Sequence, residues 1–238
     1  MTNTTSEGIN VLREIIEASC KRLGSALQAL DYPNGGVNGI FHESNLVAYL
    51  SHGFLSHSED FHCYAEAYFR STSEPSSRSG RVDLVASDGK LAFVIEAKKF
   101  GDLGASKGAC NDVKRMGKFI PRFSPAVVPR DGNWWTNSRE RWGVIAIACQ
   151  RPSVDCVHKA WLANREDEAR TAIWERKPGG ESQEKIEERN EAFLDLWKCL
   201  NEKERITIAS SFICSGKHWK QSNDAWLLWA AFPLKQDP

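Results

Sequence analysis

Apolar residues recur every three or four positions through the first part of the chain. This spacing places them along one stripe of an amphipathic helix that begins near Ser6 and runs for roughly 24 residues. We predict that the stripe packs on the body of the chain, and the alternative is that it pairs with a second copy in a homodimer. The stripe consists of Ile9, Leu12, Ile16, Cys20, Leu23, Leu27 and Leu30.

The rest of the chain alternates between helical and strand-like periodicity. Helical spacing predicts helices over 43–54, 106–120 and 181–204, with at least one short helix within 154–176. Alternating or continuous apolar runs predict strands over 60–69, 141–150, 205–215 and 224–234, and two more within 80–100. This order predicts an α/β fold in which a central mixed sheet carries helices on both faces.

The segment from Gly80 to Phe100, "GRVDLVASDGKLAFVIEAKKF", sets charged residues inside two apolar runs. Asp88-Gly89 is a favoured pair for a two-residue type I′ hairpin turn, and that turn places Ser87 opposite Lys90. In the resulting register Val94 lies opposite Asp83, and Glu96 lies opposite Arg81.

Side chains alternate between the two faces of a strand, so Asp83, Glu96 and Lys98 share one face of the predicted hairpin. Asp83 and Glu96 become diagonal neighbours, with α carbons on the order of 7–8 Å apart. The opposite face is apolar and carries Val82, Leu84, Leu91, Phe93, Ile95 and Ala97.

Two carboxylates at this spacing are able to reach one divalent cation, because Mg²⁺–oxygen bonds are about 2.1 Å long. Without a cation they repel each other, and one of them is expected to hold a proton. Lys98 lies beside them and suits an anionic oxygen or a positioned water. The plainer alternative is that these are ordinary solvated charges near strand ends.

The residues "RVDLV…FVIEAKK" resemble the core motif of the PD-(D/E)XK phosphodiesterases, the restriction-endonuclease-like superfamily. Val82 stands where the family has proline. The predicted order from Glu43 to about Gln150, a helix, a three-strand meander, a helix and a strand, is similar to the family core.

The resemblance implies roles for these residues. Asp83 and Glu96 would hold Mg²⁺ or Mn²⁺ with the carbonyl of Ala97. Lys98 would orient the attacking water or stabilise charge on the phosphate. Many family members add a glutamate from the preceding helix, and Glu43 is the candidate, with Glu66 as its rival. The alternative for Glu43 is that it favours the positive end of its helix.

Basic residues gather after the motif, although the formal net charge of the chain is zero. Residues 97–122 hold seven Lys or Arg against two Asp, whereas residues 165–204 hold eight basic and twelve acidic residues. A basic side next to the proposed metal site suits a phosphate backbone. By resemblance, Asp112 and Arg115 brace the site. The predicted nucleic-acid contacts are Lys99, Lys107, Lys114, Arg115 and Lys118, with Lys217 and Lys220 in a second basic loop.

The function expected from this resemblance is metal-dependent hydrolysis of phosphodiester bonds by an endonuclease of the restriction or defence kind. DNA is the expected partner, and RNA stays open. One alternative is a relative that keeps the fold and binds nucleic acid or protein without cutting. Another is a structural or regulatory protein that dimerises through the first helix.

Composition sets the remaining expectations. Seven cysteines without a CxxC pair argue against a disulfide framework and favour a reduced, cytoplasmic setting. We expect neither a signal peptide nor a membrane span. A single domain is expected over 1–238, with an N-terminal helix in 1–32, a nuclease-like core in 41–150, and in 151–238 a helix and strands that extend the same sheet.

Overall fold

The computed structural model describes residues 6–29, 42–70, 80–99, 103–116, 120–121, 138–149, 154–175, 182–215 and 224–234. Its helices are α1 (Glu7–Ala29), α2 (Glu43–His57), α3 (Leu103–Met116), α5 (Val154–Trp161), α6 (Glu166–Trp174) and α7 (Gln183–Asn201). Its strands are β1 (His62–Arg70), β2 (Gly80–Ser87), β3 (Leu91–Lys99), β4 (Ile120–Pro121), β5 (Glu140–Cys149), β6 (Thr207–Cys214) and β7 (Ala225–Pro233).

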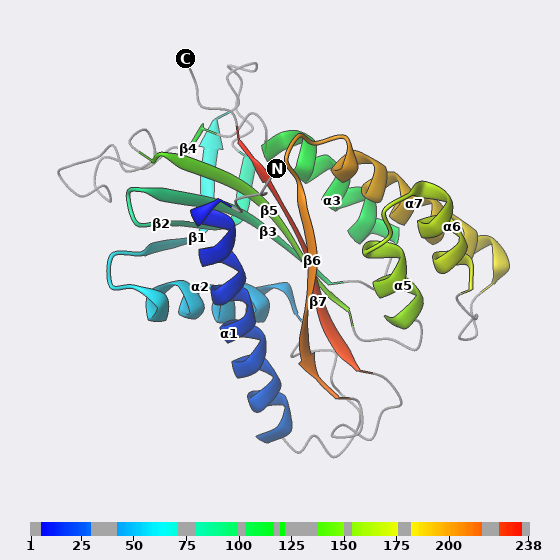
Figure 1. Cartoon of the computed structure of the whole chain (residues 1–238), viewed down its shortest axis with the longest axis horizontal. Helices are drawn as coiled ribbons and strands as arrows, with labels where there is room; N and C mark the ends of the chain where they lie inside the picture. The colour runs from blue at the N-terminus through cyan, green and yellow to red at the C-terminus, as the bar shows by residue number, and fades with distance from the viewer. Residues whose placement is uncertain are drawn as a thin grey trace.

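The strands form one mixed sheet in the order β4-β1-β2-β3-β5-β7-β6 (Figure 1). Only the β3–β5 pair among the described strands is parallel. A parallel pair needs a crossover connection, and α3 lies in the segment between β3 and β5. The predicted mixed sheet with helices is therefore confirmed as an α/β architecture.

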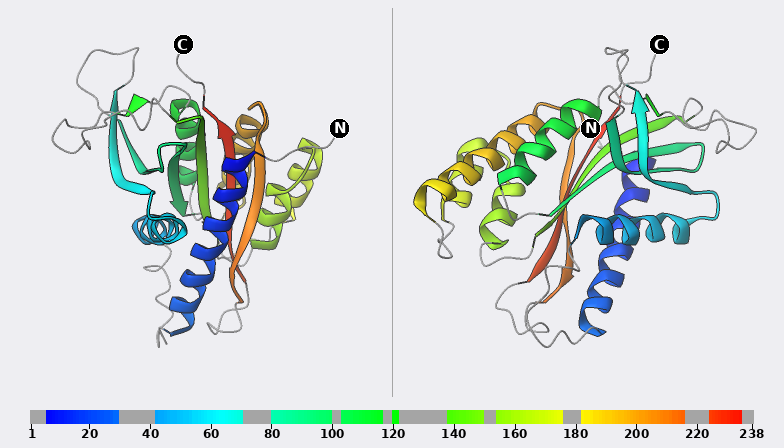
Figure 2. Two further views of the ribbon diagram at one scale, coloured as in Figure 1. Left: turned by 60° about the vertical axis from the view of Figure 1, so that its left-hand side comes forward. Right: turned by 180° about the vertical axis from the view of Figure 1, so that it is seen from behind.

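Helices cover both faces of the sheet (Figure 1 and Figure 2). One face packs on α1 and α2, and we call the apolar layer between them the first core. The other face packs on α3, α5, α6 and α7 across a second core. Both cores are shielded from solvent, since Phe93 in the first core and Trp161 in the second are completely buried.

The stripe of α1 is buried within the chain, as predicted for its core alternative. Ile9, Leu12 and Leu23 each expose at most a few per cent of their surface, all in the first core. Gly24 permits a close approach to β6, because a Cβ there would lie 2.1 Å from the carbonyl oxygen of Ile213. Leu30 lies outside the described residues.

The β2–β3 register differs from the prediction by two residues. Ser87 lies opposite Ala92, and Leu84 lies opposite Ile95, so Ser87 does not face Lys90. The paired residues of this ladder end at Leu84 and Ile95, one residue short of Asp83 and Glu96.

The turn centres on Gly89 and Lys90 and not on Asp88-Gly89. The backbone N–H of Asp88 donates to the carbonyl of Leu91, and the carboxylate of Asp88 accepts from the N–H groups of both Lys90 and Leu91. Gly89 alone in this turn has a positive φ, of 82°. That is the pattern of a type II′ turn, which has glycine at its first central position, whereas type I′ needs positive φ at both.

Two further details correct the sequence prediction. The helix expected to reach Ile120 ends at Met116, and Ile120 instead pairs with Arg70 in the short strand β4. Val82 was expected on the apolar face with Leu84, but it packs in the second core while Leu84 packs in the first. None of the described helices is long and apolar enough to cross a lipid bilayer.

Candidate functional site

A charged cluster of five side chains lies on the α3 side of the sheet. Strand β2 contributes one of them, strand β3 two and helix α3 two. The two strands of the hairpin and the helix that follows them therefore meet at one place. We call it the Lys98 cluster. Its members are Asp83, Glu96, Lys98, Asp112 and Arg115.

The ammonium of Lys98 contacts all three carboxylates. Its Nζ lies 3.2 Å from Oδ2 of Asp112, 3.3 Å from Oε2 of Glu96 and 3.6 Å from Oδ2 of Asp83. The predicted convergence of Asp83, Glu96 and Lys98 on one face is thus observed. It is compatible with the corrected register, because a shift by two residues does not exchange the faces of a strand.

Arg115 holds the other side of the cluster. Its Nη2 donates to Oε1 of Glu96 at 2.5 Å and to Oδ1 of Asp112 at 2.8 Å. The second of these contacts joins residues three apart on one helix, where side chains are natural neighbours. Glu96 therefore has a cation on each oxygen, Lys98 on one and Arg115 on the other.

Asp83 is fixed by the backbone of the neighbouring strand. Its Oδ2 accepts a hydrogen bond from the N–H of Ala97 at 2.8 Å. The N–H of Ala97 lies two residues beyond Ile95, where the β2–β3 ladder ends, so the rigid backbone of β3 holds the carboxylate toward this strand. The same oxygen is the one that faces Lys98.

Burial makes the charge on Glu96 costly. Glu96 exposes only 2 % of its surface, and this desolvation, followed by the charges of Asp112 and Asp83, raises the pKa of its carboxyl to about 8. Lys98 and Arg115 act in the opposite direction without cancelling the effect. Burial is the largest cause of the raised pKa, and the three carboxylates also outnumber the two cations by one charge.

Lys98 behaves as a permanent cation in this setting. Burial lowers the pKa of its ammonium, but Glu96, Asp112 and Asp83 together outweigh that effect and raise the pKa above the ordinary value. With Glu96 protonated, Asp83 and Asp112 still act in this direction. Lys98 is consequently suited to holding negative charge and not to accepting a proton near neutral pH.

The donor types of the cluster suit a hard divalent cation. Carboxylate and carbonyl oxygens are the ligands of Mg²⁺, which proteins commonly hold through one or two carboxylates, with water and substrate oxygens completing the shell. Within the described part of the chain, no group of three or more His, Cys, Asp or Glu side chains is arranged to hold a metal. Asp83 and Glu96 are the two carboxylates that such a site would use, and both are paired with Lys98.

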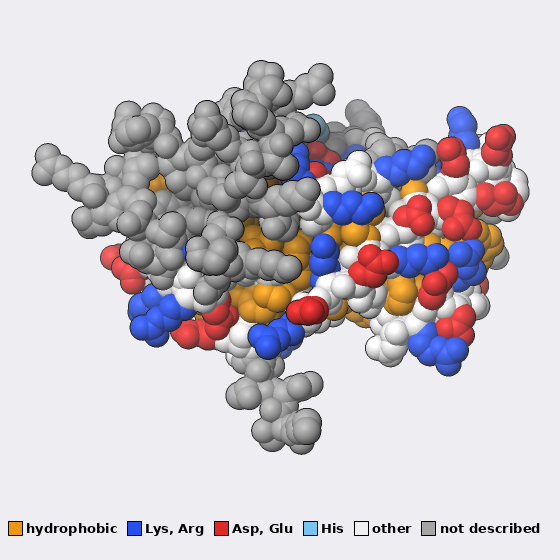
Figure 3. Space-filling view, turned by 90° about the horizontal axis from the view of Figure 1, so that it is seen from above, with side chains coloured by type: hydrophobic (Ala, Val, Ile, Leu, Met, Phe, Trp, Pro, Cys, Tyr) orange, Lys and Arg blue, Asp and Glu red, His pale blue; other side chains and the backbone are white. Residues whose placement is uncertain are grey.

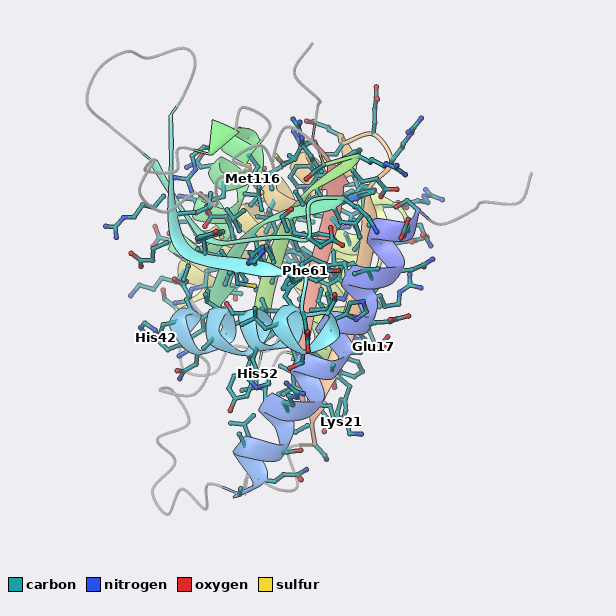
Figure 4. All side chains as sticks on the ribbon, turned by 90° about the vertical axis from the view of Figure 1, so that its left-hand side faces the viewer. Glu17, Lys21, His42, His52, Phe61 and Met116 are labelled. Carbon is teal, nitrogen blue, oxygen red and sulfur yellow. The ribbon has the colours of Figure 1, made fainter. Side chains whose placement is uncertain are left out.

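The two predicted additional glutamates lie apart from the cluster. Glu43 opens α2, whose buried residues lie in the first core on the other side of the sheet. Figure 4 shows His42, at the start of α2, and Met116, at the end of α3, on opposite sides of strand β1. The position of Glu43 in the first turn of a helix fits its electrostatic alternative.

Glu66 is directed elsewhere. It has a positive φ of 51°, its side chain is exposed, and its carboxylate pairs with Arg81 on β2. Arg81, which was expected opposite Glu96, lies opposite Tyr68 on β1. The third carboxylate beside Asp83 and Glu96 is instead Asp112, which the resemblance had placed at the site together with Arg115.

The predicted nucleic-acid contacts divide into three groups. Lys107 and Lys114 are exposed on α3, and Lys99 is half-buried at the end of β3. Arg115 is engaged with Glu96 and Asp112. Lys118, Lys217 and Lys220 lie outside the described residues. Figure 3 shows basic and acidic side chains mixed over the half of the molecule where α3, α6 and α7 lie.

Comparison with known proteins identifies no relative. No family model matches the chain, and no curated protein and no solved structure shows a significant match.

Proposed function

We propose that this chain is a metal-dependent nuclease that hydrolyses phosphodiester bonds, with DNA as the favoured substrate. The observation that carries the proposal is the meeting of Asp83, Glu96 and Lys98 within 3.3–3.6 Å contacts on one side of the β2–β3 hairpin. A buried carboxylate with a raised pKa beside a fixed cation is typical of functional sites, where charge is retained at a cost in stability.

The residues of the cluster would have different roles in this reaction. Asp83, Glu96 and the carbonyl of Ala97 would hold Mg²⁺ or Mn²⁺. When bound, the metal supplies polarisation of a phosphate oxygen and a more acidic water. Lys98, a cation at neutral pH, holds an anionic phosphate oxygen and stabilises the charge that develops there.

The two α3 residues act through others. Asp112 contacts the ammonium of Lys98 and would remain paired with it when Asp83 and Glu96 bind a metal. Arg115 holds Oε1 of Glu96 and so fixes the direction of that carboxylate. Lys107 and Lys114, exposed on the same helix, would contact a phosphate backbone.

A cleavage assay tests the proposal. Plasmid, linear and single-stranded DNA and RNA are incubated with the protein and Mg²⁺ or Mn²⁺, alongside Asp83→Asn and Lys98→Ala. Matched controls are Asp167→Asn and Lys185→Ala, which change the same charges at exposed positions of α6 and α7. We expect metal-dependent cutting that both site variants lose and both controls keep. Cutting that survives in the site variants would refute the assignment.

One observation favours a second candidate function. Lys98 already pairs with both Asp83 and Glu96, as expected of a nucleic-acid-binding module with the same fold that holds no metal and does not cut. That candidate predicts DNA binding without cutting. It also predicts that Mn²⁺ leaves the melting temperature unchanged, whereas a metal bound to the folded state raises it.

A further inference from the structure

Two cysteines face each other between α3 and α7, away from the strands of the Lys98 cluster. The Sγ of Cys199 lies 3.9 Å from the carbonyl oxygen of Cys110, and both residues are free thiols. Cys110 is half-buried and Cys199 is buried. The two cysteines lie on helices that pack directly on each other in the second core.

Helix geometry makes this pair suitable for a cross-link. Packed helices lie about 8–10 Å apart, and their α carbons lie about 2.3 Å from each axis. Facing residues directly between the two axes therefore have α carbons roughly 3.4–5.4 Å apart, a range that overlaps the 4.4–6.8 Å at which disulfides form. The contact between the Sγ of Cys199 and the backbone of Cys110 shows that these two positions do face each other.

We propose that Cys110 and Cys199 form a redox modification site, in which hydrogen peroxide converts the two thiols into a disulfide that ties α3 to α7. The resting state is the dithiol, in agreement with the reduced setting expected for the chain. This inference does not need the cluster to be catalytic.

The chemistry assigns a different part to each thiol. Cys110, the more accessible, attacks one oxygen of the peroxide as its thiolate. An S–O bond forms, the O–O bond breaks, and hydroxide leaves and takes up a proton as water. The thiolate of Cys199 then attacks Sγ of Cys110, the S–S bond forms, and the S–O bond breaks with release of a second water. Two thiols and one peroxide become one disulfide and two waters.

The surroundings fit this order. Burial, and then a hydrogen bond and charge interaction with Cys110, raise the pKa of Cys199 to about 11, so Cys199 is the poorer first nucleophile. Lys203 and Lys114 act to lower this pKa, and so they favour the thiolate of Cys199 once Cys110 is oxidised. Cys63 is a natural comparison, because it is also half-buried and its thiol donates to the carbonyl of Ser51 instead of facing a second cysteine.

The link would restrain the helix that carries Asp112 and Arg115. This consequence rests on the proposed function, since it affects nuclease activity only if the Lys98 cluster is the active site. The link itself encloses β5, α5, α6 and most of α7 in one covalent loop, and closing so long a loop stabilises the folded chain.

The test treats the full-length protein with hydrogen peroxide, blocks remaining thiols with an alkylating agent after denaturation, and maps peptides by mass spectrometry. We expect one cross-linked peptide pair holding Cys110 and Cys199, with a loss of two hydrogen atoms. The link should disappear in dithiothreitol, and the melting temperature should rise by roughly 5 °C while it is present.

Three variants make the result decisive. Cys110→Ser and Cys199→Ala should each abolish the cross-link and the thermal shift, whereas Cys63→Ser should keep both. A dominant link to another cysteine would overturn the proposal. So would sulfinic acid at Cys110 with Cys199 still alkylated, because a partner thiol within reach resolves the sulfenic acid first. These readouts use no nuclease activity, so a failure here is distinct from a failure of the proposed function.

Discussion

The ammonium of Lys98 on β3 lies 3.2 Å from Oδ2 of Asp112 on α3. The contact joins β3, which lies between β2 and β5 in the sheet, to α3, which packs on that face of the sheet in the second core. It also brings a third negative charge to two carboxylates that the hairpin already sets side by side. The first predictions follow from that excess of charge.

Asp112→Asn should lower the pKa of Glu96. The charge of Asp112 is the second of the causes that raise this pKa, after burial, and its removal leaves two carboxylates facing two cations. The measurement is a carboxyl-carbon NMR titration of Glu96 in the wild type and the variant. Asp167→Asn, on the exposed surface of α6, is the matched control and should leave Glu96 unchanged. An unaltered titration in Asp112→Asn would contradict this account of the cluster.

Glu96→Gln should change how stability depends on pH. The folded-state pKa of Glu96, about 8, lies above the unfolded value of about 4.3, so the folded state binds the extra proton between these limits. The wild type therefore loses stability as pH rises through this window, and the variant lacks that loss. With EDTA present, the unfolding free energy of the variant relative to the wild type should rise by on the order of 2–4 kcal/mol from pH 5 to pH 9. Urea unfolding at both pH values measures it, and a parallel pH response would count against the raised pKa.

Lys98→Met should separate metal binding from cleavage. The ammonium competes with a divalent cation for Asp83 and Glu96, so its removal is expected to leave Mn²⁺ bound at least as tightly as in the wild type. The variant should not cut DNA, because the cation that holds the phosphate oxygen is gone. Isothermal titration with Mn²⁺, paired with the cleavage assay, measures both. Lys185→Met, exposed on α7, should resemble the wild type in each. Mn²⁺ affinity lost together with cutting would mean that Lys98 organises the carboxylates instead of competing for them.

Two glycine substitutions should have opposite signs. Gly89→Ala is expected to destabilise the chain by about 1 kcal/mol, because Gly89 has φ of 82° and a Cβ there would meet nothing within 4 Å, so the cost is conformational. Gly108→Ala on α3 should stabilise it by about 0.5–1 kcal/mol, because the Cβ would only touch the Cε of Lys98 at 4.0 Å and alanine favours a helix. Thermal unfolding of the two variants beside the wild type checks the pair, and a loss of stability in Gly108→Ala would show that α3 is held more tightly against Lys98 than the contact indicates.

The sequence predicts the faces of the hairpin better than its register. Alternation alone places Asp83, Glu96 and Lys98 together, and that result holds for any shift by an even number of residues. The register depends on which residues form the turn. The carboxylate of Asp88 determines this, because it accepts hydrogen bonds from the N–H groups of Lys90 and Leu91. Asp88 thereby ends a strand, a role for aspartate that competes with its place in an Asp-Gly turn.

Periodicity also predicts most of the long elements, and it fails where tertiary contacts decide. Helical spacing carries on to Ile120, but the pairing of Ile120 with Arg70 on β1 draws it into a strand. Likewise, no local pattern brings Asp112 to Lys98, because that contact depends on how α3 lies across the sheet. Glu43 has the right residue type on a suitable helix, and yet its helix packs in the first core.

β3 pairs with β5 along its whole length, Leu91–Lys99, but with β2 only over Ala92–Ile95. The backbone of Glu96 and Lys98 is therefore held by the parallel ladder to β5, while the N–H of Ala97 between them donates to the side chain of Asp83. To release these two residues, the chain must open the β3–β5 ladder near the middle of the sheet, and amide hydrogen exchange in β3 should report that opening. Any smaller motion of the charged cluster must come from side chains or from α3.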